Sequence, residues 1–288
     1  MMYSMNHFIL TRFNLRLWWK EDKRGGTIQT EEWLEERFRL FETFCLPSVK
    51  EQTCQDFKWI CLFDEGTPKN FRERIGGYAE AYDRFLPFYL NAEETKKFQT
   101  YFQRKVYELA NKADESLLTT YLDNDYCLRD DYVERVQRYT QKVRYGTVFS
   151  FKYGIQYYTE QSLAVRVPYK NNHFLSYYER LGEKSRTIWG FWHFSIYNYK
   201  GIRVATINNK ENPMWVEVIH KGNIDNDVKM TLSHKLITDR IYMGRFGANF
   251  CMMSPLRSWT MFCTKFLIRF MGQVVRRGVN KIARGFHG

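Results

Sequence analysis

The sequence predicts an α/β fold in which helices flank a mainly parallel central sheet. Two observations predict this class. Short apolar runs of strand length alternate along the chain with longer segments whose apolar residues recur every three or four positions. Polar residues follow several of the apolar runs directly, and in parallel sheets ligands bind beyond the carboxyl ends of the strands. Alternating strands and helices favour a parallel sheet, because parallel neighbours need a crossover connection.

The first half of the chain supplies strands and helices in turn. Strands are expected where an apolar run ends at polar or turn-forming residues. These runs are 7–12, 57–63, 85–90 and 116–122. Helices are expected where apolar residues share one face, at 31–45, 93–111 and 130–142. Pro47 should break or kink the first helix, because proline lacks the backbone N–H, and Asp130 is the expected N-cap of the third.

The second half is less regular and ends in a basic tail. Residues 144–240 are rich in Tyr, Trp and His, with short strands expected at 147–151 and 163–167. No linker precedes residue 240, so we expect one domain over 1–240 and a helical tail over 241–288. The chain carries a net charge of +12, and nine Lys and Arg but no Asp or Glu follow Asp239. The body is therefore nearly neutral and the charge lies in the tail.

The composition excludes several classes of protein. Apolar residues make up 44% and charged residues 26%, as in a folded globular chain. The six cysteines form no C-x-x-C pair, which favours reduced core thiols over a structural zinc site. No apolar run is long enough to span a membrane, and the N-terminus lacks the pattern of a signal peptide. We therefore expect a cytoplasmic protein.

Asp123 and Asp125 are the strongest chemical motif. Two carboxylates one residue apart, just past a predicted strand, can bind one Mg²⁺ or Mn²⁺ together with phosphate oxygens. Such a cation neutralises the charge on a departing diphosphate. The alternative is a solvated turn, and for the similar triplet at 225–227 a surface turn is the better interpretation. The chain has no phosphate-binding P-loop, dinucleotide fingerprint, zincin motif or serine-hydrolase elbow.

Several segments together resemble a known family. The stretch PSVKEQT at 47–53, followed by FKWICLFD at 57–64, resembles the opening of GT-A-type glycosyltransferases. With HFILTRFN at 7–14, LDND at 122–125 and PMWVEVIHKGN at 213–223, the pattern is similar to the bacterial putative rhamnosyltransferase family, over roughly residues 6 to 235. The resemblance implies a GT-A-like nucleotide-diphospho-sugar transferase fold, a nucleotide-sugar donor, and a glycan or lipid-linked acceptor, with rhamnose as one candidate sugar.

The resemblance also implies roles for particular residues. Asp64 matches the acidic residue that contacts the donor nucleotide, and Thr11 and Arg12 match the first-strand end that lies against it. Asp123 and Asp125 match the D-x-D motif that holds the metal on the diphosphate. His220 lies where such enzymes often bring a late histidine to the metal.

The sequence does not decide which residue is the catalytic base or which aromatic residues stack on a sugar. An inverting transfer needs a base for the acceptor hydroxyl, and Glu179 and Glu217 are the candidates, each with a surface charge as its alternative. A retaining mechanism is not excluded. Three tryptophans are candidates for stacking on sugars, although core packing accounts for most of them: Trp189, Trp192 and Trp215. His193 is expected to pack among aromatic side chains.

The basic tail suggests that the protein contacts a membrane, and it also supports a competing, non-catalytic function. From Trp259 apolar residues keep helical spacing beside Lys and Arg, which favours contact between residues 256–284 and the inner face of an anionic membrane. The alternatives are a helix that packs on the domain and a dimer contact. A non-catalytic RNA- or membrane-binding module and a metal-dependent nucleotidyltransferase compete with the glycosyltransferase. We expect no nucleic-acid partner, and the sequence leaves the oligomeric state open.

Overall fold

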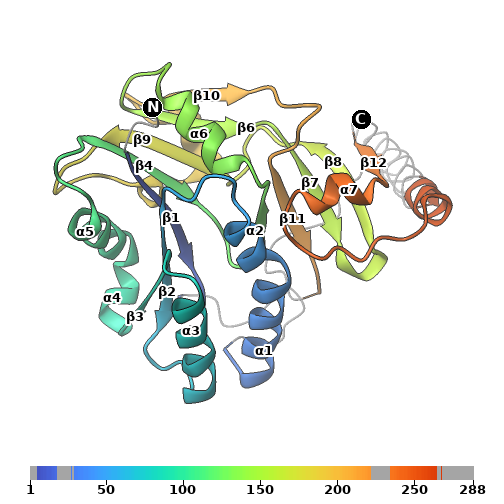
Figure 1. Ribbon diagram of the computed structural model, residues 1–288, viewed down its shortest axis with the longest axis horizontal. Coiled ribbons are helices and arrows are strands. Elements are labelled where there is room, and N and C mark those ends of the chain that lie inside the picture. The colour runs from blue at the N-terminus through green and yellow to red at the C-terminus, as the bar shows by residue number, and fades with distance from the viewer. Residues whose placement is uncertain (1–4, 18–26, 28, 222–233, 265–266, 268–288) are drawn as a thin grey trace, which may run out of the picture.

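A seven-stranded sheet forms the centre of the molecule in the computed structural model, which describes residues 5–17, 27, 29–221, 234–264 and 267 (Figure 1). The strand order is β10-β6-β9-β4-β1-β2-β3, and within this sheet only β9 runs against the others. The strands are β1 Asn6–Arg12, β2 Lys58–Asp64, β3 Phe85–Leu90, β4 Ser116–Tyr121, β6 Thr147–Phe151, β9 Leu175–Arg180 and β10 Arg203–Ile207. The predicted mainly parallel α/β sheet is confirmed.

Helices cover both faces of this sheet. Successive strand residues point to opposite faces, so Ile9 joins one core cluster and Phe8 the other. The first cluster includes residues of α1 (Glu31–Leu40), α3 (Lys69–Ala81) and α6 (Tyr132–Thr140). The second includes residues of α5 (Phe98–Leu109), which follows the short α4 (Ala92–Lys96). This three-layer arrangement leaves the carboxyl edge of the strands open to a ligand.

A second, five-stranded sheet packs beside the first. Its order is β12-β8-β7-β11-β5. The strands are β5 Cys127–Leu128, β7 Tyr153–Tyr158, β8 Leu163–Pro168, β11 Trp215–Ile219 and β12 Lys235–Ile237. One face joins the first core cluster, and the other packs with Leu40 and Phe44 and with α7 (Arg240–Gly244). The second half thus contributes β6, β9 and β10 to the main sheet and β7, β8, β11 and β12 to the small sheet, which pairs with β5 just after the loop that follows β4.

The first predicted helix continues past Pro47. Helix α1 is followed by a π-helical turn, η1 (Phe41–Cys45), and then by α2 (Leu46–Lys50). Pro47 lies in the first turn of α2, where its missing N–H costs little, and the wider turn before it accommodates the ring. The expected break at Pro47 is therefore wrong.

Three other helix predictions need correction. The helix expected at 93–111 is two helices, α4 and α5, which separate at Lys97. Asp130 is not an N-cap, because its carboxylate pairs with Arg245 instead. Helix α3 was missed, since its two central glycines, Gly76 and Gly77, interrupt the apolar pattern.

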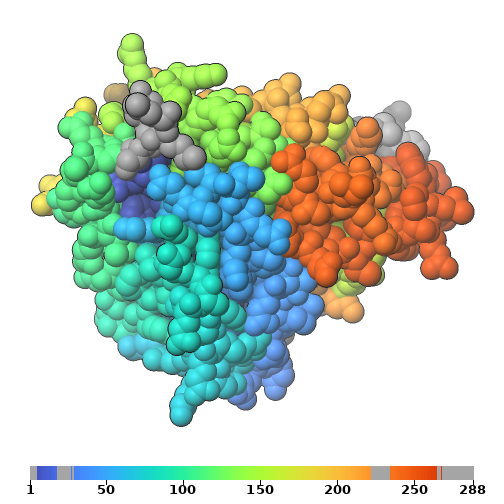
Figure 2. Space-filling view, in the orientation of Figure 1, coloured from blue at the N-terminus to red at the C-terminus, as the bar shows by residue number. Residues whose placement is uncertain are grey.

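The described part of the predicted tail begins with contacts to the body. Met243 and Phe246 belong to the core cluster that also contains Leu40 and Phe44. Gly247 has a φ of +67°, and a Cβ atom at this position would lie only 2.8 Å from the Pro47 carbonyl oxygen. Figure 2 shows this orange-to-red segment lying against the blue segment that contains α1 and α2. Residues up to about 252 therefore pack on the domain.

A further helix over 255–264 follows. Phe262 packs against the first core cluster, whereas Leu256, Trp259 and Leu267 are 78%, 54% and 57% exposed. The remainder of 256–284, like the 225–227 triplet, lies outside the described residues. No described helix is both long and apolar enough to cross a membrane.

Candidate active site

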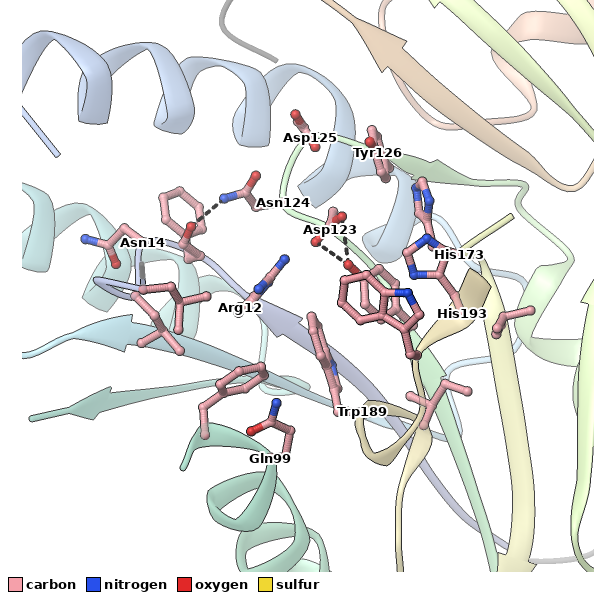
Figure 3. A pocket seen from close by; sticks show the side chains of 18 of the residues that line it. Arg12, Asn14, Gln99, Asp123, Asn124, Asp125, Tyr126, His173, Trp189 and His193 are labelled. Atoms are coloured by element: carbon pink, nitrogen blue, oxygen red, sulfur yellow. Dashed lines mark hydrogen bonds between the residues drawn. The ribbon is translucent and has the colours of Figure 1, made fainter. Parts of the chain in front are cut away.

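A pocket of about 350 Å³ lies at the carboxyl edge of the main sheet (Figure 3). Its lining comes from the end of β1, from α1, from the loop after β4 and from a segment with two short 3₁₀ turns, η3 (Ile188–Gly190) and η4 (His193–Asn198). Strands β1 and β4 are parallel neighbours, with Leu10 opposite Tyr121. Their carboxyl ends therefore bring Arg12 and Asp123 to the same pocket.

Asp123 presents a buried carboxylate to this pocket. The Tyr121 hydroxyl donates to it, at 3.0 and 2.9 Å from its two oxygens. Burial raises the pKa of Asp123, and the positive charge of Arg12 opposes that shift. Asn124, between the two aspartates, donates from Nδ2 to the Phe13 carbonyl oxygen at 2.9 Å, which ties the loop to the end of β1.

Asp125 is held by two partners from distant parts of the chain. Arg37 of α1 donates to Asp125 Oδ2 at 2.8 Å, and His220 Nε2 lies 3.0 Å from the same oxygen. Burial would raise the pKa of Asp125, but the hydrogen bonds from His220 and Arg37 outweigh burial and lower it. Asp125 is therefore ionised. His220 lies behind it and does not line the pocket.

Arg12 extends along an aromatic wall. Its guanidinium carbon lies 4.9 Å from the ring centroid of Trp189 and 5.9 Å from that of Phe98. A guanidinium stacked on aromatic rings keeps its charge and its donors available to an anion. Arg12 thus supplies positive charge beside the indole of Trp189.

Thr11 and Asp64 do not line the pocket. The Thr11 side chain is fully buried and accepts a hydrogen bond from Trp59 Nε1 at 2.9 Å. The Asp64 carboxylate accepts from the backbone N–H of Gly66 at 2.8 Å and pairs with Arg16 at 3.4 Å. Asp64 is linked to the pocket through Asn14, which lines it and whose Oδ1 accepts from the Asp64 backbone N–H at 3.1 Å.

Neither candidate base lies at the pocket. Glu217 is buried in β11 and accepts from Gln156 Nε2 at 2.7 Å. The Glu179 carboxylate accepts from the backbone N–H groups of Arg186 and Thr187, at 2.9 and 2.7 Å, just before η3. Burial raises the pKa of Glu179, although these two hydrogen bonds oppose the shift. The structure gives both carboxylates partners away from the cavity.

The three tryptophans have different surroundings. Trp215 is fully buried and stacks on Phe174 at 4.5 Å, so it belongs to the core. Trp189 lines the pocket, stacks on Phe102 and donates from Nε1 to the Leu10 carbonyl oxygen at 3.2 Å. Trp192 lines the pocket and is 57% exposed. Two of the three are therefore available to a ligand.

Several pocket residues were not identified from the sequence. Arg37 lies in a helix whose other members suggested only packing, and Tyr121 was counted as a strand residue. His173 precedes β9 in a stretch without a motif, and its ring centroid lies 5.5 Å from that of His193. His193 packs among aromatic rings, as expected, and it also lines the pocket. Only the three-dimensional arrangement marks these residues.

The carboxylates fit a divalent cation that arrives with a phosphate-bearing ligand. Asp123 and Asp125 both line the pocket, and Mg²⁺ commonly uses one or two carboxylates with phosphate and water oxygens in the remaining positions. Among the described residues, no cluster of three or more His, Cys, Asp or Glu is arranged to hold a metal ion. The pocket thus contributes two carboxylates, each already hydrogen-bonded to a neighbouring side chain.

Solved structures similar to this chain share little sequence with it. S. aureus TarS residues 1–349 have 8% identity and a TM-score of 0.42, over 74% of this chain and 60% of that chain. The same TarS fragment in complex with UDP has 9% identity and a TM-score of 0.42, over 75% and 61%. The apo form of mouse xyloside xylosyltransferase 1 has 5% identity and a TM-score of 0.30, over 50% and 51%. The matched part thus spans less than two thirds of those chains.

The comparison with protein families identifies the family of this chain. No curated protein matches the chain. A model of the family described as putative rhamnosyl transferase matches residues 11–232, which is more than half of the 288 residues and includes every described pocket residue. The chain therefore belongs to the putative rhamnosyl transferase family.

Proposed function

We propose that this protein is a glycosyltransferase that moves a sugar from a nucleotide-sugar donor to a glycan or lipid-linked acceptor, with a divalent cation on the donor diphosphate. The observation that carries the proposal is the meeting of Arg12, Asp123 and Asp125, from two adjacent strand ends, around one pocket with an aromatic wall. Rhamnose, the sugar in the family description, is the first candidate for the transferred group.

Each polar residue has a distinct part in this proposal. Arg12 binds a diphosphate oxygen through its donors. Asp123 and Asp125 hold Mg²⁺ or Mn²⁺, which when bound neutralises charge on the leaving diphosphate. Arg37 and His220 orient Asp125 by hydrogen bonding, so His220 supports a ligand instead of facing the pocket itself. Asp64 acts on the nucleotide side through Asn14.

A thermal-shift screen of nucleotide-sugars with and without Mn²⁺ tests the proposal. One donor should raise the melting temperature more in the presence of Mn²⁺, and Asp125→Ala should abolish that increment. Glu65→Gln is the matched control, because Glu65 is exposed at the same sheet edge and does not line the pocket. Donor binding and turnover that survive both Asp125→Ala and EDTA would contradict the role of the cation.

The same screen separates the competing functions. A nucleotidyltransferase would respond to a nucleoside triphosphate and release pyrophosphate, whereas the proposed enzyme releases a nucleotide from a nucleotide-sugar. A non-catalytic module would bind RNA in a salt-dependent manner and ignore every donor. Either result would replace the proposed function.

We also propose that the enzyme acts at the inner face of a membrane. Residues 256–284 supply an apolar and basic segment, and among the described ones Leu256, Trp259 and Leu267 are exposed. Large exposed apolar side chains beside Lys and Arg suit an anionic surface. Contact there would keep a lipid-linked acceptor close to the pocket.

A further inference from the structure

The proposed transfer needs a group that accepts the proton of the acceptor hydroxyl, and the pocket offers few. The carboxylates of Glu179 and Glu217 bind partners elsewhere. Those of Asp123 and Asp125 are assigned to the cation. The Tyr121 hydroxyl donates to the Asp123 carboxylate, so its proton is already engaged and it does not serve as a base. The two histidines of the pocket remain.

We propose that Trp192, His193 and Phe194 form the acceptor subsite, in which an acceptor sugar ring packs on the aromatic side chains and His193 accepts the proton of the attacking hydroxyl. The inference rests on the proposed function and deepens it, because it adds the acceptor side of the reaction. These three consecutive residues line the same pocket as Asp123 and Arg12.

The geometry of the segment suits a sugar. Trp192 and Phe194 are 57% and 50% exposed although both rings are large and apolar. Their ring centroids lie 6.0 Å apart, and the His193 ring packs against both, 5.7 Å from Trp192 and 4.0 Å from Phe194. Exposed aromatic faces beside a pocket favour a ligand with an apolar face and a hydroxylated edge, which describes a pyranose.

His173 supplies an independent sign of a ligand. Its Nε2 is buried and has no hydrogen-bond partner among the described residues. A buried polar atom without a partner is costly, and a ligand hydroxyl would remove that cost. Figure 3 shows His173 and His193 side by side, next to Asp123. The unpartnered nitrogen therefore lies beside the proposed base.

The protonation state of His193 agrees with this role. Burial, with smaller contributions from His173 and Arg12, lowers the pKa of His193 to about 4, and Asp123 opposes the shift. The imidazole is thus neutral near pH 7 with a lone pair for a proton, and the same lowered pKa makes it a weaker base than a free imidazole, so the role rests on its position beside the acceptor rings. His193 lies between the exposed residues Trp192 and Phe194 in the chain, so an acceptor packed on those two rings lies beside it.

The proton and electron pairs balance in the proposed step. The acceptor oxygen forms a bond to the anomeric carbon of the donor while the bond from that carbon to the diphosphate oxygen breaks. The electron pair of the broken bond leaves with the diphosphate, beside Arg12. The hydroxyl proton passes to a ring nitrogen of His193 and is later released to water.

Chemical rescue tests the base. The assay measures nucleotide release from the donor that the thermal-shift screen identifies. One reaction contains water alone, and the others add an acceptor probe, which is an octyl glycoside of glucose, galactose, mannose, rhamnose or N-acetylglucosamine. His193→Ala should lower the best rate by about 10² to 10⁴-fold. The donor-induced thermal shift should stay unchanged, and added imidazole should restore part of the rate.

The aromatic side chains have a separate readout. Trp192→Ala and Phe194→Ala should raise KM for the best octyl glycoside roughly three- to tenfold, because each removes a ring on which the acceptor sugar packs. Tyr197→Ala is the matched control, since Tyr197 lies in η4 and is 37% exposed but does not line the pocket. If KM in Trp192→Ala and Phe194→Ala equals KM in Tyr197→Ala and in wild type, the acceptor subsite is overturned.

Failure of this inference differs from failure of the proposed function. If no nucleotide-sugar binds or turns over, the proposed function is contradicted. If the donor binds and turns over but His193→Ala and His193→Gln stay within about threefold of wild type, the base assignment alone is overturned. Loss of the donor-induced shift in both variants, without rescue by imidazole, would show that His193 holds the donor site together instead.

Discussion

Arg129 and Asp131 show how single residues support the loop that carries the two aspartates. Arg129 is fully buried and donates to both carboxylate oxygens of Asp131, at 2.6 and 2.7 Å. Arg135 adds a third hydrogen bond to Asp131. A buried charge pair is stable only when its hydrogen-bonding groups are satisfied, which is the case here. The pair lies directly after β5, close in sequence to Asp125.

Asp131→Asn should destabilise the protein in a pH-dependent way. Burial raises the pKa of Asp131, but the hydrogen bonds from Arg129 and Arg135 outweigh burial and lower it to about 2. A carboxyl with a lowered pKa stabilises the fold above its unfolded pKa, and that contribution is lost as the pH falls from about 4 to about 2. The free energy of unfolding near neutral pH should drop by about 2–4 kcal/mol.

Urea unfolding at neutral and at acidic pH checks this expectation. The difference between Asp131→Asn and wild type should shrink as the pH approaches the lowered pKa. Glu93→Gln is the control, because Glu93 pairs with Lys96 on the surface and its loss should not measurably change stability. A pH-independent loss in Asp131→Asn would mean that packing, and not charge, explains the effect.

At the residue scale, the sequence identified Arg12, Asp123 and Asp125 but not their neighbours. Side chains alternate between faces along a strand, so a shift of one position separates Arg12 at the pocket from Thr11 beneath Trp59. The packing of the whole sheet decides which of these two side chains points toward the ligand. Arg37 is one of several charged residues in its helix, and only its contact with Asp125 distinguishes it.

At the scale of elements, η3 is fixed by side chains of the sheet. Glu179 of β9 accepts two backbone N–H groups just before it, and Thr119 of β4 accepts the N–H of Ile188 at 2.8 Å. Thr187 has a φ of 57°, a strained value for a β-branched residue, so this turn needs external support. The next residues carry Trp189 and Trp192 into the pocket. Glu179 is therefore a positioning residue.

Glu179→Gln should separate positioning from base catalysis. One amide oxygen cannot replace two carboxylate oxygens, so the segment should loosen and KM should rise. The free energy of unfolding should fall by about 1–3 kcal/mol. Because the side chain does not touch the pocket, kcat should change less than tenfold, against the about 10² or more expected for a lost base.

Steady-state kinetics with the identified donor, together with thermal melting, measure both effects. Thr119→Ser is a suitable control, since it keeps the hydroxyl that accepts from Ile188. A loss of kcat of about 10²-fold with unchanged KM and stability would instead return Glu179 to the role of base.

At this scale the sequence predicted strands better than helices. Each expected strand is present, since an apolar run bounded by polar residues leaves few other structures. Helix boundaries failed where the local pattern was interrupted. Pro47 follows a π-helical turn, and Gly76 and Gly77 lie inside α3, so tertiary packing outweighed local propensity in both places.

For the whole molecule, the C-terminal segment links the fold to its surroundings. Its first part covers the second sheet, and the helix at 255–264 turns Phe262 to the core but leaves Leu256 and Trp259 exposed. In the described part of the predicted apolar ladder, Phe262 thus packs on the protein while Trp259 and Leu267 are exposed. An exposed tryptophan next to basic residues is suited to a lipid headgroup region.

Sedimentation with vesicles tests the membrane contact. The full chain should bind phosphatidylglycerol vesicles and bind phosphatidylcholine vesicles weakly, and high salt should reduce the binding. The double variant Leu256→Ala with Trp259→Ala should bind roughly tenfold or more weakly, because it removes buried apolar area at the lipid boundary. Tyr197→Ala, an exposed aromatic residue elsewhere, should not differ from wild type. Equal binding by all variants would contradict the contact.

The sequence by itself determined six of the twelve strands in the described residues, the mainly parallel class of the central sheet and the edge at which polar residues gather, because these follow from local apolar periodicity and chain order. Only the tertiary structure decided which polar side chains share the pocket. It placed Glu179 and Glu217 with other partners and brought His173, His193 and Arg37 to the cavity from separate elements. The physical reason is that proximity across the chain depends on how layers pack, and that information is spread over every residue of the core.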